Sequence, residues 1–199
     1  ELIQIDPSNT RVRRATRVLL ARDAINAMSA RDHSDHSAGL GSRRRDEVQA
    51  YIHFLQSEST REDSDLDQLS SLTRIAQLYE RLGEDKRSER YWKRAFRLNP
   101  EFLPASQGLG RAAHRRESWS ELVSLYRREL SALAPRSPQR VELLRRLAEV
   151  YEHKLRRDTS AARCHEDILE ILSEDAAALN SLDRLYQRLG DWRALARVW

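Results

Sequence analysis

Apolar residues recur along most of the chain every three or four positions, the spacing that places them on one face of a helix. In the first part, this pattern predicts a long amphipathic helix over residues 9–30 and a second helix over residues 46–56. Residues 31–45 between them contain two glycines with several serines and aspartates, which predicts a mobile loop. We interpret residues 1–65 as the end of a preceding repeat followed by a degenerate repeat with an insertion, or by a spacer.

From Leu69 onward the pattern changes to pairs of short helices. In the first pair, one helix has the apolar stripe Leu72, Ile75, Ala76 and Tyr79, and the returning helix has Tyr91, Trp92, Ala95 and Phe96. Gly83 permits the left-handed turn that ends the first of these helices. Asn99-Pro100 then closes the unit, because proline cannot continue a helix.

One segment of this pattern occurs twice. Residues 78–84 read LYERLGE and residues 185–191 read LYQRLGD, with a looser copy around Tyr151. Tyr79 and Tyr151 are 72 residues apart and Tyr151 and Tyr186 are 35 apart, so the underlying period is close to 35. A period in this range marks a stacked helical-repeat protein, in which each unit buries its second apolar stripe against its neighbour.

These units resemble the tetratricopeptide repeat. The first complete unit matches the family pattern at Leu72, Ile75, Ala76, Tyr79, Gly83, Ser88, Trp92, Ala95 and Pro100. The resemblance implies an all-α, right-handed α-solenoid of antiparallel helix pairs with about ten helices. It divides the array at 66–199 into three full repeats and a truncated fourth, at 69–102, 103–138, 139–175 and 176–199. An extra residue between Lys154 and Thr159 predicts a local distortion.

In this family the first helices of successive repeats line a concave groove that binds partner segments. The positions matched onto partner-binding residues are Arg74, Gln77, Arg81, Arg111, Arg115, Arg145, Arg146, Asn180, Arg184 and Arg188. Most are arginine, whose planar guanidinium binds carboxylates through two parallel hydrogen bonds. The resemblance therefore implies a basic groove for an acidic protein or peptide. The alternative is that arginines on a solvated helix face bind no ligand.

The composition supports a helical protein with a basic surface. The 199 residues carry a formal charge of +4, and of the 35 basic residues only Lys86, Lys93 and Lys154 are lysine. Such arginine usage is also typical of bacteria with GC-rich genomes. No apolar run reaches the roughly 20 residues needed to span a bilayer. We therefore expect no membrane insertion and a cytoplasmic location, with the periplasm left open.

Other functions find weaker support in the sequence. Arg43-Arg44-Arg45 could contact nucleic-acid phosphates, but no aromatic residues interleave them, which argues against nucleic-acid binding. His33, Asp35 and His36 lack the spacing of a structural zinc site, and Cys164 falls on an apolar helix pattern, which favours a packed thiol.

No phosphate loop, nucleophile elbow or metalloprotease motif occurs, so we expect neither catalysis nor a metal or cofactor. The sequence thus favours a non-catalytic scaffold for protein–protein interactions. Two alternatives remain: a substrate-positioning or regulatory arm of a larger enzyme or signalling protein, and a module that self-associates through the C-terminal edge around Leu195 and Trp199.

Overall fold

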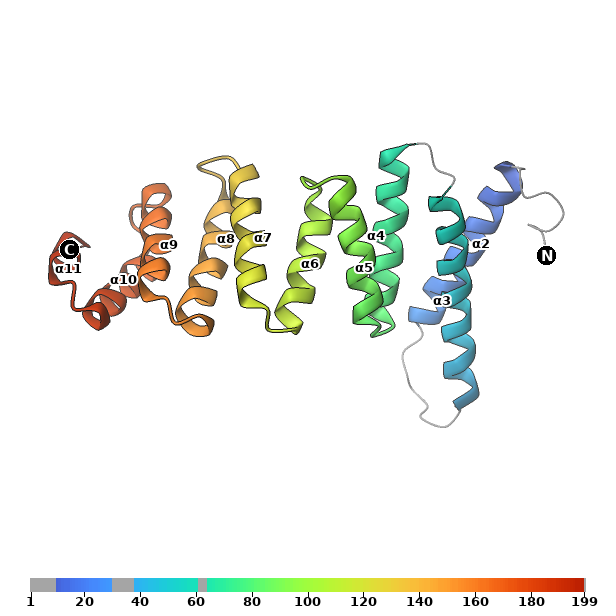
Figure 1. Ribbon diagram of the computed structural model, residues 1–199, viewed down its shortest axis with the longest axis horizontal. Coiled ribbons are helices and arrows are strands. Elements are labelled where there is room, and N and C mark those ends of the chain that lie inside the picture. The colour runs from blue at the N-terminus through green and yellow to red at the C-terminus, as the bar shows by residue number, and fades with distance from the viewer. Residues whose placement is uncertain (1–9, 30–37, 61–63, 199) are drawn as a thin grey trace. The chain divides into compact units, whose positions relative to one another are not determined.

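The computed structural model describes residues 10–29, 38–60 and 64–198, and all regular structure in these residues is helical (Figure 1). The chain divides into two compact units, unit 1 (Glu1–Ala105) and unit 2 (Ser106–Trp199). The helices of unit 1 are α2 (Thr10–Ser29), α3 (Ala38–Ser59), α4 (Asp65–Arg81) and α5 (Asp85–Leu98). Nearly all of α6 (Leu103–Arg115) lies in unit 2, followed by α7 (Trp119–Ala132), α8 (Pro138–Glu149), the π-turn η1 (Val150–Lys154), α9 (Asp158–Ile171), α10 (Ala176–Leu189) and α11 (Trp192–Val198). The described residues thus form ten helices, which confirms the expected all-α solenoid of helix pairs.

Unit 1 is held together by successive packing of neighbouring helices, α2 on α3, α3 on α4 and α4 on α5. Its apolar core consists of Ala24, Val48, Tyr51, Ile52, Phe54, Leu55, Ile75, Leu78 and Tyr79. The rings of Tyr79 and Tyr91 stack at 5.6 Å, and Gln56 Nε2 donates a hydrogen bond to Tyr91 Oη at 2.7 Å. Because these residues come from three helices, the contact fixes α3 against the α4–α5 pair.

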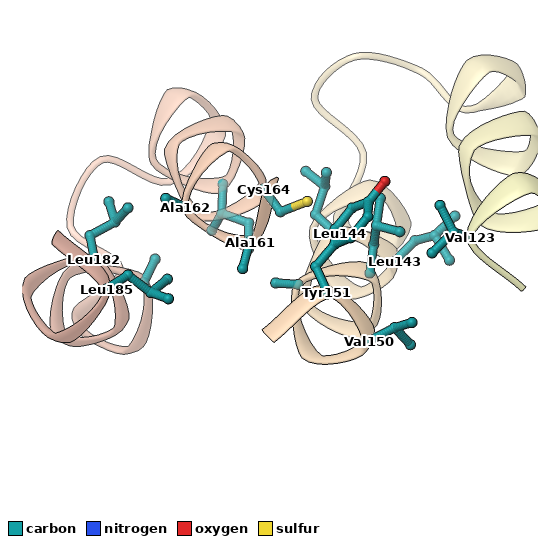
Figure 2. Close-up of a cluster of buried hydrophobic side chains, with 14 of the residues drawn as sticks. Val123, Leu143, Leu144, Val150, Tyr151, Ala161, Ala162, Cys164, Leu182 and Leu185 are labelled. Atoms are coloured by element: carbon teal, nitrogen blue, oxygen red, sulfur yellow. The ribbon is translucent and has the colours of Figure 1, made fainter. Parts of the chain in front are cut away.

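Unit 2 has a separate core that runs through α7, α8, α9 and α10. Figure 2 shows part of this cluster, with Val123, Leu144, Tyr151, Cys164 and Leu182 among its members. Cys164 is 5 % exposed, and burial raises the pKa of its thiol to about 12. This burial confirms the prediction of a packed thiol. A thiol that stays protonated at neutral pH is also a poor nucleophile.

Among the described residues, four adopt a left-handed backbone conformation, each just after the first helix of a pair. They are Gly83, Glu117, Arg156 and Gly190, with φ values of 72°, 55°, 53° and 68°. After α4, the amide of Glu84 donates to the carbonyl of Tyr79 and that of Gly83 to Glu80. The amides of Asp191 and Gly190 repeat this pattern with Tyr186 and Gln187. The duplicated segment is therefore a Schellman helix end, made twice.

A π-turn lies in the third pair, where the spacing of the left-handed residues is longer. These residues are 34 apart from Gly83 to Glu117 and from Arg156 to Gly190, but 39 apart from Glu117 to Arg156, which is five residues more. In η1 the amide of Leu155 donates to the carbonyl of Val150, five residues back, which absorbs one of these five residues without breaking the helix. The local distortion expected near Lys154 therefore includes a π-turn.

One expectation for unit 1 is wrong. Residues 38–45, expected in the mobile loop at 31–45, are helical, because α3 begins at Ala38. Gly39 and Gly41 each cost a helix about 1 kcal/mol relative to alanine, but the following arginines are good helix formers. The helix expected at 46–56 is therefore longer at both ends.

Several expectations lie outside the described residues. They concern residues 1–7, the histidines and aspartate at 33–36, and Trp199. The division into three full repeats and a truncated fourth stays a prediction. None of the helices in the described ranges combines the length and the apolar character that crossing a membrane requires.

Candidate partner-binding cavities

Unit 2 contains a cavity of about 460 Å³ between α6, α7 and α8, which we call the unit 2 cavity. Its lining residues are Ser106, Gln107, Gly110, Arg111, His114, Arg115, Tyr126, Glu129, Leu143 and Arg146. On α6 these residues recur every three or four positions, so one face of that helix forms a whole wall of the cavity. The volume falls in the range of small-ligand pockets.

The unit 2 cavity is basic. Arg111, Arg115 and Arg146 line it together with a single carboxylate, that of Glu129. Burial raises the pKa of the Tyr126 phenol, against the opposing charge of Arg146. The phenol therefore stays protonated at neutral pH and can donate a hydrogen bond. Guanidinium, amide, imidazole and phenol groups that line one cavity suit an anionic ligand.

Aromatic contacts hold the rim of this cavity. The rings of His114 and Trp119 meet edge to face with centroids 5.2 Å apart, and Lys154 Nζ lies 4.9 Å from the centre of the Trp119 ring. Lys154 ends the π-turn, so this cation–π contact joins η1 to the start of α7. The turn after α6, in which Glu117 is left-handed, is thereby fixed between His114 and Trp119.

Unit 1 contains a second cavity of about 440 Å³, the unit 1 cavity. Its lining residues are Arg17, Tyr51, Leu66, Leu69, Ser70, Thr73, Arg74, Gln77 and Phe102. Six of them lie on one face of α4, and the others come from α2, α3 and the segment before α6. Compared with the unit 2 cavity, it is apolar, with arginine only at Arg17 and Arg74.

Three of the predicted binding arginines are instead held by carboxylates of unit 2. Glu152, whose side chain is 5 % exposed, lies 3.2 Å from Arg184 and 2.9 Å from Arg188. Burial opposes ionisation of Glu152, but the hydrogen bond from Arg188 and the charge of Arg184 outweigh it, so its pKa lies below the usual range. Arg145 pairs in the same way with Asp175. These arginines join α8, η1 and α10.

The ten predicted residues thus fall into distinct environments. Arg111, Arg115 and Arg146 come together in the unit 2 cavity, and Arg74 and Gln77 in the unit 1 cavity. Arg145, Arg184 and Arg188 are in ion pairs, while Arg81 and Asn180 are exposed on their helices outside both cavities.

The sequence reasoning missed the contributions of the other elements to the cavities. In the unit 2 cavity, α7, the second helix of its pair, contributes Tyr126 and Glu129. In the unit 1 cavity, the lining includes Arg17 and Phe102, which are more than 25 residues away in sequence from Thr73 in the middle of α4. No cluster of histidine, cysteine and carboxylate groups suited to a metal ion occurs within the described ranges.

Comparison with known proteins supports the resemblance. A family model of the tetratricopeptide repeat matches residues 105–141. A tetratricopeptide repeat protein from Parabacteroides merdae is similar in structure, with a TM-score of 0.59, 12 % identity, and coverage of 92 % of this chain and 64 % of that one. A putative kinesin light chain with nearly identical TPR-like repeats from Podosopora anserina has a TM-score of 0.54 at 17 % identity, covering 93 % of this chain and 90 % of its own.

This chain has the helical-repeat fold of the tetratricopeptide type. The solved chain of MamA 41-end from Desulfovibrio magneticus shares the same fold, with a TM-score of 0.53, 13 % identity, and coverage of 92 % of this repeat protein and 90 % of that chain. No curated protein matches the sequence. The tetratricopeptide fold is, in general, one that supports scaffolds for protein–protein interactions.

Proposed function

We propose that this repeat protein is a non-catalytic interaction scaffold that binds an acidic segment of a partner protein in the unit 2 cavity. The observation that carries the proposal is the convergence of Arg111 and Arg115 from α6 and Arg146 from α8 on one cavity, whose lining includes a single carboxylate, that of Glu129. A glutamate or aspartate side chain entering this cavity would meet several guanidinium groups at once. Such charge complementarity favours acidic partners over neutral ones and speeds association.

The ion pairs elsewhere in unit 2 sharpen this proposal. Arg184 and Arg188 already neutralise Glu152, and Arg145 neutralises Asp175, so an acidic partner would have to displace a carboxylate there. Arg146 is different, because its Glu142 partner is 59 % exposed and its Nε contact of 3.0 Å is an ordinary surface pair. Surface pairs contribute little stability and exchange readily. Binding should therefore depend on Arg146 more than on the α10 arginines.

Fluorescence anisotropy with a labelled glutamate-rich peptide, and with a glutamine-rich peptide of equal length, tests the proposal. We expect only the glutamate-rich peptide to bind, with an affinity that falls as salt rises. Replacing Arg111 and Arg115 together by glutamate should weaken binding by about tenfold or more, since each 1.4 kcal/mol lost is about tenfold.

The matched control is the double change Arg163→Glu and Arg193→Glu, which alters the net charge equally on exposed helix positions outside the cavity. This variant should keep most of the binding if the cavity is the site. Equal losses in both double variants would mean that net charge alone attracts the peptide, and the proposed site would then be rejected. Circular dichroism checks that both variants remain helical.

A further inference from the structure

The unit 1 cavity combines apolar walls with two arginines. Tyr51 and Leu69 are 4 % and 3 % exposed, so they form a rigid floor that belongs to the packed core. Leu66 is 76 % exposed, the highest value among the exposed large apolar side chains of the described residues. A leucine this exposed beside a concave apolar floor is a surface that an apolar ligand group would cover.

The polar groups of this cavity are equally specific. Arg17 on α2 and Arg74 on α4 are both half-buried, and neither has an ion-pair partner within the described part of the chain. Thr73 lies between Leu69 and Gln77 on the same face of α4. Its hydroxyl is buried and has no hydrogen-bond partner among the described residues. A buried hydroxyl without a partner is costly, and a ligand with a hydrogen-bonding group would satisfy it.

We propose that the unit 1 cavity is an anchor pocket for a partner peptide with a leucine- or phenylalanine-sized side chain next to an aspartate or glutamate. The apolar side chain packs against Leu66, Leu69 and Tyr51, and the adjacent carboxylate pairs with Arg17 and Arg74. This inference rests on the proposed function and adds a requirement to it: acidic residues alone do not fill this pocket.

The pocket's chemistry favours a peptide over other occupants. Two arginines from different helices flank an apolar floor, which suits an apolar side chain and a carboxylate held close together by one backbone. The open side of the cavity exposes Leu66 and Ser70, so an extended backbone can pass over it. A cavity of about 440 Å³ has room for one large side chain and part of its neighbours.

Two labelled peptides test the proposal by fluorescence anisotropy: an acidic peptide with a leucine at its centre, and its twin with serine in place of that leucine. We expect the leucine peptide to bind about tenfold tighter, the difference expected when one large apolar side chain is buried. Leu66→Ser should remove most of this difference in affinity without changing the affinity for the serine twin. Because Leu66 is so exposed, this substitution leaves the core intact.

The matched control is Leu172→Ser, which changes a leucine 47 % exposed in unit 2, outside this cavity. Equal affinity for the two peptides, or equal effects of Leu66→Ser and Leu172→Ser, would overturn the proposal. The double variant Arg17→Gln/Arg74→Gln should weaken binding of the leucine peptide. It should have a smaller effect on binding of a version of this peptide with glutamine in place of its acidic residues. Laurate provides a further test. If laurate displaces the leucine peptide at concentrations at which the serine twin does not, the cavity is a fatty-acid site, and this result counts against a peptide anchor.

Failure of this inference can be told apart from failure of the proposed function. If both peptides bind equally and lose affinity in Arg111→Glu/Arg115→Glu, the unit 2 site stands and the anchor pocket is rejected. If only the leucine peptide binds, and Leu66→Ser abolishes that binding, the anchor pocket stands and the acidic site in unit 2 is rejected.

Discussion

Two of the four left-handed residues in the described part of the chain, Glu117 and Arg156, are not glycine, and this has a measurable cost. A side chain in this conformation is disfavoured by about 1 kcal/mol, because its Cβ approaches the following carbonyl oxygen. Glu117→Gly should therefore raise the free energy of unfolding by about 0.5 kcal/mol, after the greater flexibility of glycine in the unfolded chain is counted. Urea denaturation measures this.

The opposite substitution provides the control. Gly83→Ala should lower the free energy of unfolding by about 1 kcal/mol, although an added Cβ at Gly83 would meet no atom within 4 Å. Space is thus available, and only the backbone conformation penalises the change. If both substitutions shifted stability in the same direction, the left-handed geometry would not be the cause.

These residues also show what a sequence can reveal at this scale. Gly83 and Gly190 indicate helix ends by themselves, because glycine favours the left-handed region. Glu117 and Arg156 occupy the equivalent positions but carry no such preference, so only the backbone identifies them. Likewise, Arg184 and Arg188 look like any exposed arginines in the sequence. Their pairing with Glu152 depends on α10 packing beside η1, and no local pattern predicts that contact.

The buried carboxylate of Glu152 should make stability depend on pH. Its pKa is lowered in the folded protein from the ordinary value of 4.5, so its ionised form stabilises the fold. This contribution is fully present above the unfolded pKa and is lost as pH falls through the folded pKa. Glu152→Gln should therefore cost about 1–2 kcal/mol at pH 7, a figure reduced because both arginine partners are partly exposed.

Urea denaturation at several pH values checks this expectation. The difference between the parent protein and Glu152→Gln should shrink below pH 4.5 and vanish at the lowest pH at which both still fold. Glu142→Gln is a suitable comparison, because Glu142 makes an exposed pair with Arg146. A pH-independent difference for Glu152→Gln would show that shape, and not charge, links η1 to α10.

At the scale of single helices, the serine before α8 acts as a true N-cap. The amide of Arg140 donates to Ser137 Oγ at 3.2 Å, and Pro138 occupies the first turn. Ser118 stands at the same place before α7 but makes no such bond. Ser137→Ala should therefore destabilise the protein by about 1 kcal/mol, and Ser118→Ala by almost nothing. Thermal unfolding of the two variants distinguishes them, and equal losses would contradict the capping role.

Helices α3, α4 and α5 show how far the sequence specifies the helices of the fold. Apolar spacing was sufficient to predict helices in α4 and α5, because Ile75, Trp92 and Ala95 are all buried as expected. It was not sufficient for the start of α3, where glycines suggested a loop. The cavities were harder still, because Leu66, Arg17 and Phe102 come from elements distant in sequence, and only tertiary packing brings them together.

At the scale of the whole molecule, the two units have separate cores. Ile75 belongs to the core of unit 1 and Ile168 to that of unit 2, and both are 0 % exposed. In repeat proteins stability is close to a sum of local terms, so a core defect acts mainly on its own part of the array. Each unit also contains a tryptophan, Trp92 in unit 1 and Trp119 in unit 2, that can report its unfolding.

Single-tryptophan variants, in which the other tryptophans are replaced by phenylalanine, allow each unit to be followed by fluorescence during urea unfolding. Ile75→Val removes one buried methyl group and should cost about 0.5–1.5 kcal/mol. It should lower the midpoint reported by Trp92 more than that reported by Trp119, while Ile168→Val should do the reverse. If each substitution moved both midpoints equally, the units would unfold as one cooperative body, and the separation of the cores would have no thermodynamic consequence.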